Sequence, residues 1–576
     1  MIKEQIKNLI EKSVRSLYSD IQDKEIYFTV EHPADLSHGD YSSNVSLILS
    51  KKLGLSPKEV AEKIILEINK SLPENILKVN IAGPGFINFY FKNDFFLENI
   101  KKIITNGEKF GSSELGKNKK VLVDYSGPNI AKPFTVGHLR STIIGDVLAN
   151  ILVFLGYKVI RDNHLGDWGT QFGKQMVAIE KWGSLEALEK SENKVKYLVD
   201  LYVKFHEESE KDISLEDLAR NRFADLERGE KKAREMYDTT IKYSLEYFDS
   251  VYKRLKVNPF DTTLGESFYR EYMKGILDEL EKRGVARESE GALAVFFNDE
   301  KFPPFLIRKA NGSTLYATSD LASDKYRLNT YGDDLIIINE TGTEQILHFK
   351  QLFETEKMLG WIKDGQRVHI SHGMYRFKEG KMSTRKGNVI WLEEIIDEAV
   401  NKAREINSDV AEEVAISAIK FNDLKRESKQ DINFDWKGIL DLRGDSGPYL
   451  QYYYARANSV LEKAKNENIK AEIKIGKKDA EQNEEGDEKG NEISHLEKII
   501  YYFPEVVERA GKEYSPHYIA TYLIEIAGAF NSFYAKEQIV NRDDENSAYR
   551  VAITKAFSIV MKNGLNLLGI PVLEKM

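Results

Sequence analysis

The sequence predicts an α/β protein built around a parallel sheet, with a smaller α+β unit before the sheet and a helical region after it. Strand-like and helix-like patterns alternate between residues 121 and 370, and few strand signals follow residue 396. A strand, a helix and a second strand succeed one another between residues 121 and 161. That succession is typical of a βαβ unit with parallel strands and a right-handed crossover. At 576 residues the chain is long enough to build several hydrophobic cores.

Composition excludes several classes of protein. The 41% apolar and 30% charged residues are typical of globular domains and exclude disorder for most of the chain. Because the chain has no cysteine, disulfides, thiolate metal sites and a cysteine nucleophile are excluded. The net charge of −9 gives no global sign of a polyanionic partner, although a local basic face remains compatible with it. We expect no membrane span and no targeting peptide, and therefore a cytoplasmic protein.

Residues 1–112 are predicted to form the small α+β unit. Apolar residues recur at helical spacing in 2–18 and 57–71, which predicts two amphipathic helices. Residues 83–85, Gly-Pro-Gly, indicate a turn, and the alternating apolar residues after it predict a half-buried strand that includes Phe89.

Residues 113–395 are predicted to form the α/β domain. Its first strand, at residues 121–123, leads through a Gly-Pro-Asn turn into a long helix. Residues 176–300 are mostly helical in pattern and highly charged, so we expect a helical insertion rather than further sheet. The remaining predicted elements are a strand at 158–161, a hairpin turn at Asn311-Gly312, a strand at 335–338, a helix at 344–359 and a strand at 368–370.

Residues 396–576 are predicted to be helical. The stretch 464–494 is of low complexity and too polar to bury a core, which predicts a solvated loop between helices.

The segment PNIAKPFTVGHLRST, residues 128–142, is the first with a chemical signature. It follows a predicted strand, and ligands of open α/β sheets bind at the carboxyl ends of strands. Gly137 and His138 begin a helix, whose free N–H groups and positive dipole suit a phosphate. Gly137 leaves room for a flat ring, and His138 adds a donor. Taken alone, however, the Val-Gly-His triplet more often marks an ordinary capped helix.

The second such segment is KMSTRKG, residues 381–387. Its two outer lysines lie five residues apart and could both reach a polyphosphate, while glycines bracket the segment as in a mobile loop. Taken alone, an exposed basic turn explains it equally well. The P-loop, the dinucleotide fingerprint and the HExxH zinc motif are all missing from the sequence.

Together and in this order, the two segments resemble the HIGH and KMSKS signatures of class I aminoacyl-tRNA synthetases. The longer string VDYSGPNIAKPFTVGHLRSTIIGD, with NHLGDWGTQFG, LYATSDLA and GPYLQYYYARA, resembles the arginyl-tRNA synthetase family over essentially the whole chain. The resemblance implies a Rossmann-type catalytic domain at 113–395. It also implies an N-terminal domain, 1–112, that meets the tRNA elbow, and a C-terminal helical bundle, 396–576, that meets the anticodon.

The resemblance also implies a reaction. ATP and L-arginine would give arginyl-adenylate and pyrophosphate, and the arginyl group would pass to the 3′ end of tRNA(Arg), with Mg²⁺ bridging phosphates. The family commonly needs bound tRNA for the first step. We expect a monomer. Two other functions are open at this point: an ATP nucleotidyltransferase that adenylates a small metabolite, and a non-catalytic paralogue that only binds RNA.

The residues that match the family's ATP site are Lys132, Thr135, Gly137, His138, Lys381, Ser383 and Lys386. Of these, Thr135, His138, Lys381 and Lys386 are expected to be catalytic. Thr135 stands where the family has the first histidine of HIGH. A hydroxyl is shorter than an imidazole but still donates one hydrogen bond, so we expect a working substitute.

Arginine is a planar cation, and its site needs a carboxylate that accepts the fork of N–H groups. Asp320 is the best candidate, with Tyr316 four residues earlier and Thr318 or Ser319 capping the helix between them. The alternative is that Asp320 only complements a helix dipole. For the α-amino group, the family match points to Asp124 and Asn129, assisted by Ser126. Gln345 matches a further pocket position, and His164 either lines or braces the site.

Two groups of residues are candidates for tRNA contact. Phe86 and Asn88 match the elbow-binding region of the N-terminal domain. Tyr449 and Tyr453, with Tyr452 and Tyr454, could stack on bases, although packing inside a helix bundle is the favoured alternative.

Overall fold

The computed structural model describes residues 2–18, 27–298, 301–376, 391–405, 407–433, 435–439, 441, 444–473 and 493–576. Lys381, Ser383 and Lys386, and most of the predicted 464–494 loop, lie outside the described residues. Contacts divide the chain into two compact units. One is Met1–Phe110 with Arg456–Glu505 and Glu525–Lys562, and the other is Gly111–Ala455 with Val506–Ile524 and Asn563–Met576.

The N-terminal part of the first unit is an antiparallel sheet in the order β1-β2-β4-β3, with helices beside it. Its predicted helices and its predicted strand after residue 85 are confirmed. The second helix starts sharply because Ser56 and Glu59 form a capping box around Pro57. The elements are α1 Ile2–Leu17, β1 Val30–Glu31, β2 Tyr41–Ser43, α2 Val45–Leu53, α3 Pro57–Asn69, β3 Ile76–Ala82, β4 Phe86–Phe91 and α4 Asn93–Asn106.

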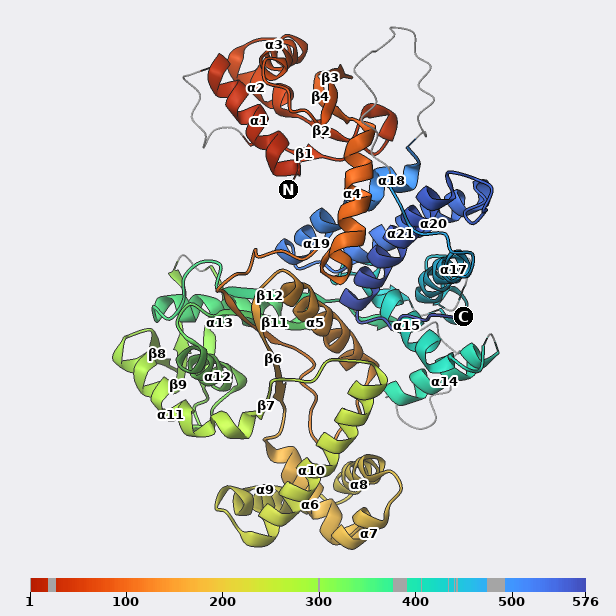
Figure 1. Ribbon diagram of the computed structural model, residues 1–576. Helices are drawn as coiled ribbons and strands as arrows, with labels where there is room; N and C mark the ends of the chain where they lie inside the picture. The colour runs from red at the N-terminus through yellow and green to blue at the C-terminus, as the bar shows by residue number, and fades with distance from the viewer. Residues whose placement is uncertain are drawn as a thin grey trace, which may run out of the picture. The chain divides into compact units, whose positions relative to one another are not determined.

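The predicted helical region near the C-terminus is confirmed for the described residues (Figure 1). Within the first unit, Phe530 and Phe557 stack face to face with ring centroids 4.0 Å apart, which joins two of its helices. The helices are α14 Leu392–Arg404, α15 Ala411–Leu424, α16 Trp436–Ile439, α17 Gly447–Asn466, α18 His495–Ile500, α19 Phe503–Lys512, α20 His517–Lys536 and α21 Ser547–Leu567.

The second unit is built on a five-stranded, wholly parallel sheet in the order β12-β11-β5-β6-β7. Both faces are covered, as parallel sheets require. Leu122 packs with the apolar residues of α11 and α12, whereas its neighbours Val121 and Val123 pack with those of α5. The elements are β5 Lys120–Asp124, α5 Val136–Phe154, β6 Lys158–Leu165, β7 Thr262–Gly265, α11 Glu266–Lys282, α12 Tyr316–Tyr331, β11 Ile336–Gly342, α13 Ile346–Met358 and β12 Arg367–His372.

The strand order places a crevice at the carboxyl end of β5. The chain passes from β5 to β6 on one side of it, and β11 joins it later from the other side. Such a switch point opens a gap between the flanking loops, where open α/β sheets bind ligands. The predicted strands of this sheet and the hairpin turn at Asn311-Gly312 are confirmed; Gly312 has φ +83° between the paired residues Arg308 and Thr314.

The expectation of helices rather than sheet over 176–300 is wrong in its last third. The helices α6 to α9 lie together away from the sheet (Figure 1), but α10 returns to it, where Tyr252 bonds to Asn163 of β6, and β7 then joins the parallel sheet as its edge strand. A separate antiparallel sheet follows, whose first hairpin turns at Glu290 and Gly291, both with positive φ. The bounds are α6 Thr170–Trp182, α7 Leu185–Lys190, α8 Lys194–Ser209, α9 Ser214–Glu227, α10 Lys231–Arg254, β8 Ala286–Ser289, β9 Ala292–Val295 and β10 Phe305–Arg308.

Helix α5 is the centre of the second unit. Among the described residues it is the one helix long and apolar enough to span a membrane, but 78% of that apolar window is buried inside the protein. A long apolar helix buried to this extent is a core helix. It packs closely against the turn after β5, because a Cβ on Gly145 would overlap the ring of the buried Tyr125.

We therefore expect Gly145→Ala to lower the thermal unfolding temperature, with a destabilisation of roughly 1–3 kcal/mol from overpacking. The matched control is Gly275→Ala, in the exposed interior of α11, where a Cβ meets nothing within 4 Å. That change should stabilise the protein by about 0.5–1 kcal/mol through helix propensity. Shifts of the same sign in the two variants would contradict the packing described.

Candidate active site

A cavity of about 920 Å³ lies at the carboxyl ends of β5, β6, β11 and β12. Its walls are the loops after these strands and the beginnings of α5, α11, α12 and α13. Of the residues that the sequence marked as candidates, the structure brings together around this cavity Asp124, Ser126, Asn129, Gly137, His138, His164, Tyr316, Asp320 and Gln345.

At the start of α5 the backbone fixes the state of the His138 imidazole. The Thr135 N–H donates to His138 Nδ1 over 3.0 Å, and the Thr135 hydroxyl lies 3.1 Å from the same nitrogen. Burial lowers the pKa of His138 to about 4, with Lys132 and His372 adding to the shift. The imidazole is therefore neutral, and because Nδ1 accepts, its proton is on Nε2, which is free to donate to a ligand.

The first turn of α5 is open toward the cavity. Gly137 is exposed, and a Cβ built on it would meet only the Thr135 hydroxyl, at 3.4 Å. Lys132 is close enough to lower the pKa of both His138 and Glu266. A helix N-terminus and a neutral imidazole donor thus share one side of the cavity, and the charge of Lys132 acts on it from nearby, which suits a polyanion.

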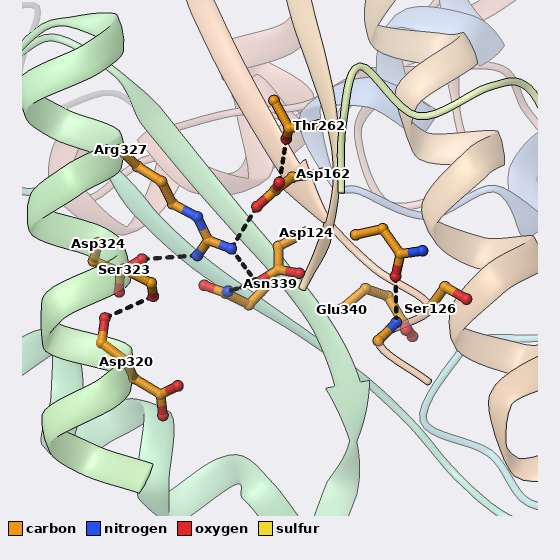
Figure 2. Close-up of polar contacts among 12 residues, drawn as sticks. Asp124, Ser126, Asp162, Thr262, Asp320, Ser323, Asp324, Arg327, Asn339 and Glu340 are labelled. Carbon is orange, nitrogen blue, oxygen red and sulfur yellow. Dashed lines mark hydrogen bonds and ion pairs between the residues drawn. The ribbon is translucent and has the colours of Figure 1, made fainter. Parts of the chain in front are cut away.

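The strand ends carry a row of polar side chains. Asn339, Asp124 and Asp162 occupy neighbouring positions on β11, β5 and β6. Asp124 accepts hydrogen bonds from Arg327 and Asn339, both over 2.9 Å, and its side chain is 18% exposed (Figure 2). Burial raises the pKa of Asp124, and the nearby Asp162 adds to this while Arg327 opposes it. Asn129 lies against Gly166, whose missing side chain makes room for it.

Ser126, which lines the cavity, also holds the turn after β5. Its hydroxyl bonds to the Thr142 and Tyr252 hydroxyls, 2.8 Å away in each case, and its N–H donates to Ser141. The residue has φ +74°, so these contacts hold a tight turn after β5. The structure therefore gives the Ser126 side chain a bracing role in the cavity wall.

Asp320 lies on α12 at the other end of the cavity, with its Oδ2 2.6 Å from Nε2 of His348. Tyr316 is the first residue of the helix and 72% exposed. The expectation that Thr318 or Ser319 caps the helix is wrong, because the helix starts earlier, with Leu315 at the N-cap. The Thr318 hydroxyl donates instead to the Ile307 carbonyl.

The sequence interpretation missed Glu266, the first residue of α11, which also lines the cavity. Burial raises the pKa of Glu266 to about 7, with Asp320 and Asp167 adding to the shift. The turn that presents it is held by Asp167, which accepts from the N–H and hydroxyl of Ser267. Glu266 follows β7, so recognising that strand would have placed it at the ligand-binding edge of the sheet.

His164 lines the cavity from the end of β6. Its ring stacks on Tyr269, with centroids 5.3 Å apart, and neither ring nitrogen has a hydrogen-bond partner among the residues described. Both nitrogens are shielded from solvent, which favours the bracing role of the ring over direct contact with a ligand.

Comparisons with known proteins decide the family. Residues 2–91 match the arginyl tRNA synthetase N-terminal domain, residues 99–436 the catalytic domain of class I (R) tRNA synthetases, and residues 450–576 the DALR anticodon binding domain. The arginine–tRNA ligase of Fusobacterium nucleatum subsp. nucleatum is 39% identical over 99% of both chains. That of Clostridium perfringens is 40% identical over 99% of this chain and all of its own length.

The chain belongs to the arginyl-tRNA synthetase family. Solved structures agree in fold. The arginyl-tRNA synthetase of Plasmodium falciparum superposes with a TM-score of 0.80 at 24% identity, covering 100% of this chain and 99% of that one. The Thermus thermophilus enzyme gives a TM-score of 0.79 at 22% identity, with both chains fully covered. An anticodon-binding domain excludes the alternative of a nucleotidyltransferase that works without tRNA.

Two of the residues expected to contact tRNA in this synthetase are buried. Asn88 is only 2% exposed and accepts a hydrogen bond from Ser42, and Tyr453 is 7% exposed. Both side chains are packed inside the protein, which argues against direct contact with tRNA. Tyr453 packs edge-on against Tyr449, as the bundle-packing alternative predicts. Phe86 is 37% exposed and stays a candidate, as does the half-buried Tyr449.

The contacts of Thr135 predict different effects for two substitutions at this position. Thr135→Val keeps the backbone donor to His138 but removes the hydroxyl. The rate of arginine activation, measured with tRNA present, should therefore fall only about three- to tenfold, the worth of one neutral hydrogen bond. Thr135→Ser should retain the wild-type rate. An unchanged rate in the valine variant would show that the hydroxyl does not substitute for the histidine of HIGH.

Proposed function

We propose that this cavity is where the chain, as an arginine–tRNA ligase, activates L-arginine with ATP and passes it to the 3′ end of tRNA(Arg). The observation that carries the proposal is the division of the cavity into an acidic side and a donor-rich side. Glu266, Asp320 and Asp124 line the first, and Gly137 and His138 line the second. An amino acid with two cationic groups and a polyanion would thus lie next to each other. The carboxylate of the first and the α-phosphate of the second would lie between them.

The acidic pair binds the guanidinium. Asp320 offers a carboxylate held by His348, and Glu266 is near enough to Asp320 for their charges to interact. An arriving guanidinium satisfies both groups with its fork of donors, and it favours the ionised form of Glu266. Tyr316 and Gln345 lie beside them on the cavity wall. At the other end, Asp124 and Asn129 accept from the α-ammonium group.

The donor-rich side binds ATP. The first turn of α5 and the Nε2–H of His138 would hold phosphate oxygens, with Lys132 and Thr135 in support. Lys381, Ser383 and Lys386 are proposed from their motif alone, as the groups that neutralise the departing pyrophosphate. The arginine carboxylate attacks the α-phosphorus, and the bond from that phosphorus to the pyrophosphate oxygen breaks. No strong base is needed, because the carboxylate is already ionised.

Mg²⁺ is proposed as a companion of ATP. In the part of the chain that is described, no group of three or more histidines and carboxylates could hold a metal ion. Mg²⁺ commonly enters such sites on substrate phosphates rather than in an all-protein cage. Its chemistry would be to neutralise charge on the phosphate oxygens.

The matches to three family models support a role for each domain. We propose that residues 1–112 meet the tRNA elbow, that 113–395 form the catalytic domain with its insertion near 176–300, and that 396–576 bind the anticodon region. Activation of arginine is proposed to require bound tRNA, as is common in the family. Because the chain has no cysteines that an oxidising compartment would pair, we place it in the cytoplasm, where we propose that it acts as a monomer.

A charging assay with ATP, tRNA and amino acid tests the function. Arginine should be attached and citrulline rejected, because citrulline has the shape of arginine but brings no positive charge to the partly buried carboxyl groups of Asp320 and Glu266. Asp320→Asn should raise KM for arginine by about a hundredfold or more through loss of a charge-assisted pair. The control is Asp364→Asn, at an exposed aspartate after α13. Near-normal arginine affinity in Asp320→Asn would overturn the assignment.

The raised pKa of Glu266 predicts a pH dependence. Because the free carboxyl has a pKa of about 7, it is mostly neutral at pH 6 and mostly ionised at pH 8. The cation binds the ionised form, so kcat/KM for arginine should rise through neutral pH with an apparent pKa near that value. Glu266→Gln should remove this inflection and lower kcat/KM at pH 8. Persistence of the inflection in that variant would assign it to another group.

A further inference from the structure

We propose that Arg327 is a positioning residue of the amino-acid subsite, which holds Asp124 by one oxygen and leaves the other to accept from the substrate's α-ammonium group. The inference rests on the proposed role of Asp124 and deepens it. Arg327 does not line up with any signature motif, and its side chain is 3% exposed. Because the side chain is buried, we infer its role from the residues that it contacts.

The guanidinium of Arg327 lies over the row of polar side chains at the strand ends. Its Nη2 donates to Oδ2 of Asp124, on β5, and to Asp162, on β6 (Figure 2). Its Nη1 donates to Asp324 over 3.0 Å. One planar group thus ties two adjacent strands to α12.

Both donors to Asp124 bind the same oxygen. Oδ2 accepts from Arg327 and from Asn339, each over 2.9 Å. Among the described residues, no hydrogen bond is made to Oδ1, although Asp124 borders the cavity. Two bonds to one oxygen fix the carboxylate plane, so the second oxygen is presented to the cavity in one orientation.

The charges around Arg327 leave room for one more cation. Arg327 pairs with Asp124, Asp162 and Asp324, and Arg367 pairs with Asp324 and with Glu356, whose pKa burial raises well above its usual range. Three aspartates against two arginines leave a surplus negative charge. Asp324 is enclosed between the two arginines, whereas Asp124 reaches the cavity, so a substrate ammonium group can complete the cluster there.

The same helix also carries Asp320, so α12 links the two ends of the proposed arginine site. Asp320 and Arg327 are seven residues apart, close to two full turns, and therefore lie on the same face about 10 Å apart along the axis. Because Arg327 holds Asp124, it sets the position of Asp124 relative to Asp320, the carboxylate proposed to bind the substrate's guanidinium. A rigid helix thus defines the length of amino acid that fits.

The test uses two inhibitors of arginine charging. Agmatine keeps the guanidinium and the amine of arginine but lacks the carboxylate, whereas δ-guanidinovalerate keeps the guanidinium and carboxylate but lacks the amine. Arg327→Gln should weaken inhibition by agmatine, and raise KM for arginine, by roughly ten- to a hundredfold. Inhibition by δ-guanidinovalerate should change by less than about threefold. Arg327→Lys, which keeps the charge, should restore part of the loss.

The matched control is Arg367→Gln. Arg367 belongs to the same buried cluster and pairs with Asp324 and Glu356, and no ion pair joins it to Asp124 among the described residues. Its loss should affect both inhibitors alike, whatever it does to the unfolding temperature. Equal weakening of both inhibitors by Arg327→Gln would overturn the inference, since that is the signature of general damage.

Two more variants separate the possible failures. If Arg327→Gln does not fold, Asn339→Ala removes the other donor to Oδ2 and should weaken agmatine selectively; equal effects on both inhibitors would overturn the inference. Asp124→Asn tests the subsite itself. If it weakens agmatine selectively while Arg327→Gln does not, the inference alone is wrong. If it shows no selectivity, the proposed ammonium site is wrong as well.

Discussion

The buried contact of Arg327 with the strand ends is the interaction on which the site depends. β5 and β6 are neighbours in a parallel sheet, so Asp124 and Asp162 are forced side by side at one edge. Two adjacent carboxylates that are shielded from water repel each other and resist ionisation. A guanidinium in the same plane satisfies both, and because it arrives on α12, it brings the helix that carries Asp320 to the edge of the crevice.

Such a cluster is an uncertain source of stability. Taking charges out of water costs several kcal/mol per ion, and replacing buried ion pairs by apolar groups is often neutral or stabilising. What the cluster provides here is a defined arrangement. α5 contains a second example: Arg140 donates to Asp423 on α15 and to the carbonyls of Gly373 and Gln430. Gly373 lies just after β12 and lines the cavity, so a buried arginine again links a helix to a wall of the site.

The fold was predictable where apolar periodicity is strong. The strands near residues 121 and 336 and the helix at 57–69 follow from local pattern alone. β7 was missed because four residues, two of them threonines, lie between charged helices and show neither a long apolar run nor alternation. The hairpin at Glu290-Gly291 did carry a turn signal. Because β7 was not recognised, Glu266 was missed as well. A glutamate that does not follow a predicted strand is interpreted as a surface residue.

The site was predictable where a motif marks it, because motifs report which residues meet the ligand and not what supports them. Asp124, Asn129, His138 and Asp320 were expected at one cavity and lie there. Arg327 has no local signal, because a charged residue in a helix usually faces solvent. Burial likewise argues against Asn88 and Tyr453 as tRNA contacts, and a half-polar strand or a tyrosine-rich helix does not reveal which of its faces is inside.

The separation of charges in the cavity explains how one site can hold both a cation and a polyanion. The acidic groups proposed to bind arginine belong to β5, α11 and α12, whereas the donors proposed for phosphate belong to the first turn of α5 and the preceding loop. In the proposed reaction, arginine would neutralise the acidic side and remove its repulsion of a triphosphate. Because coupling between two binding sites is reciprocal, the proposal requires bound ATP to favour arginine to the same extent. The arginine carboxylate and the α-phosphorus would then meet between the two sides of the cavity.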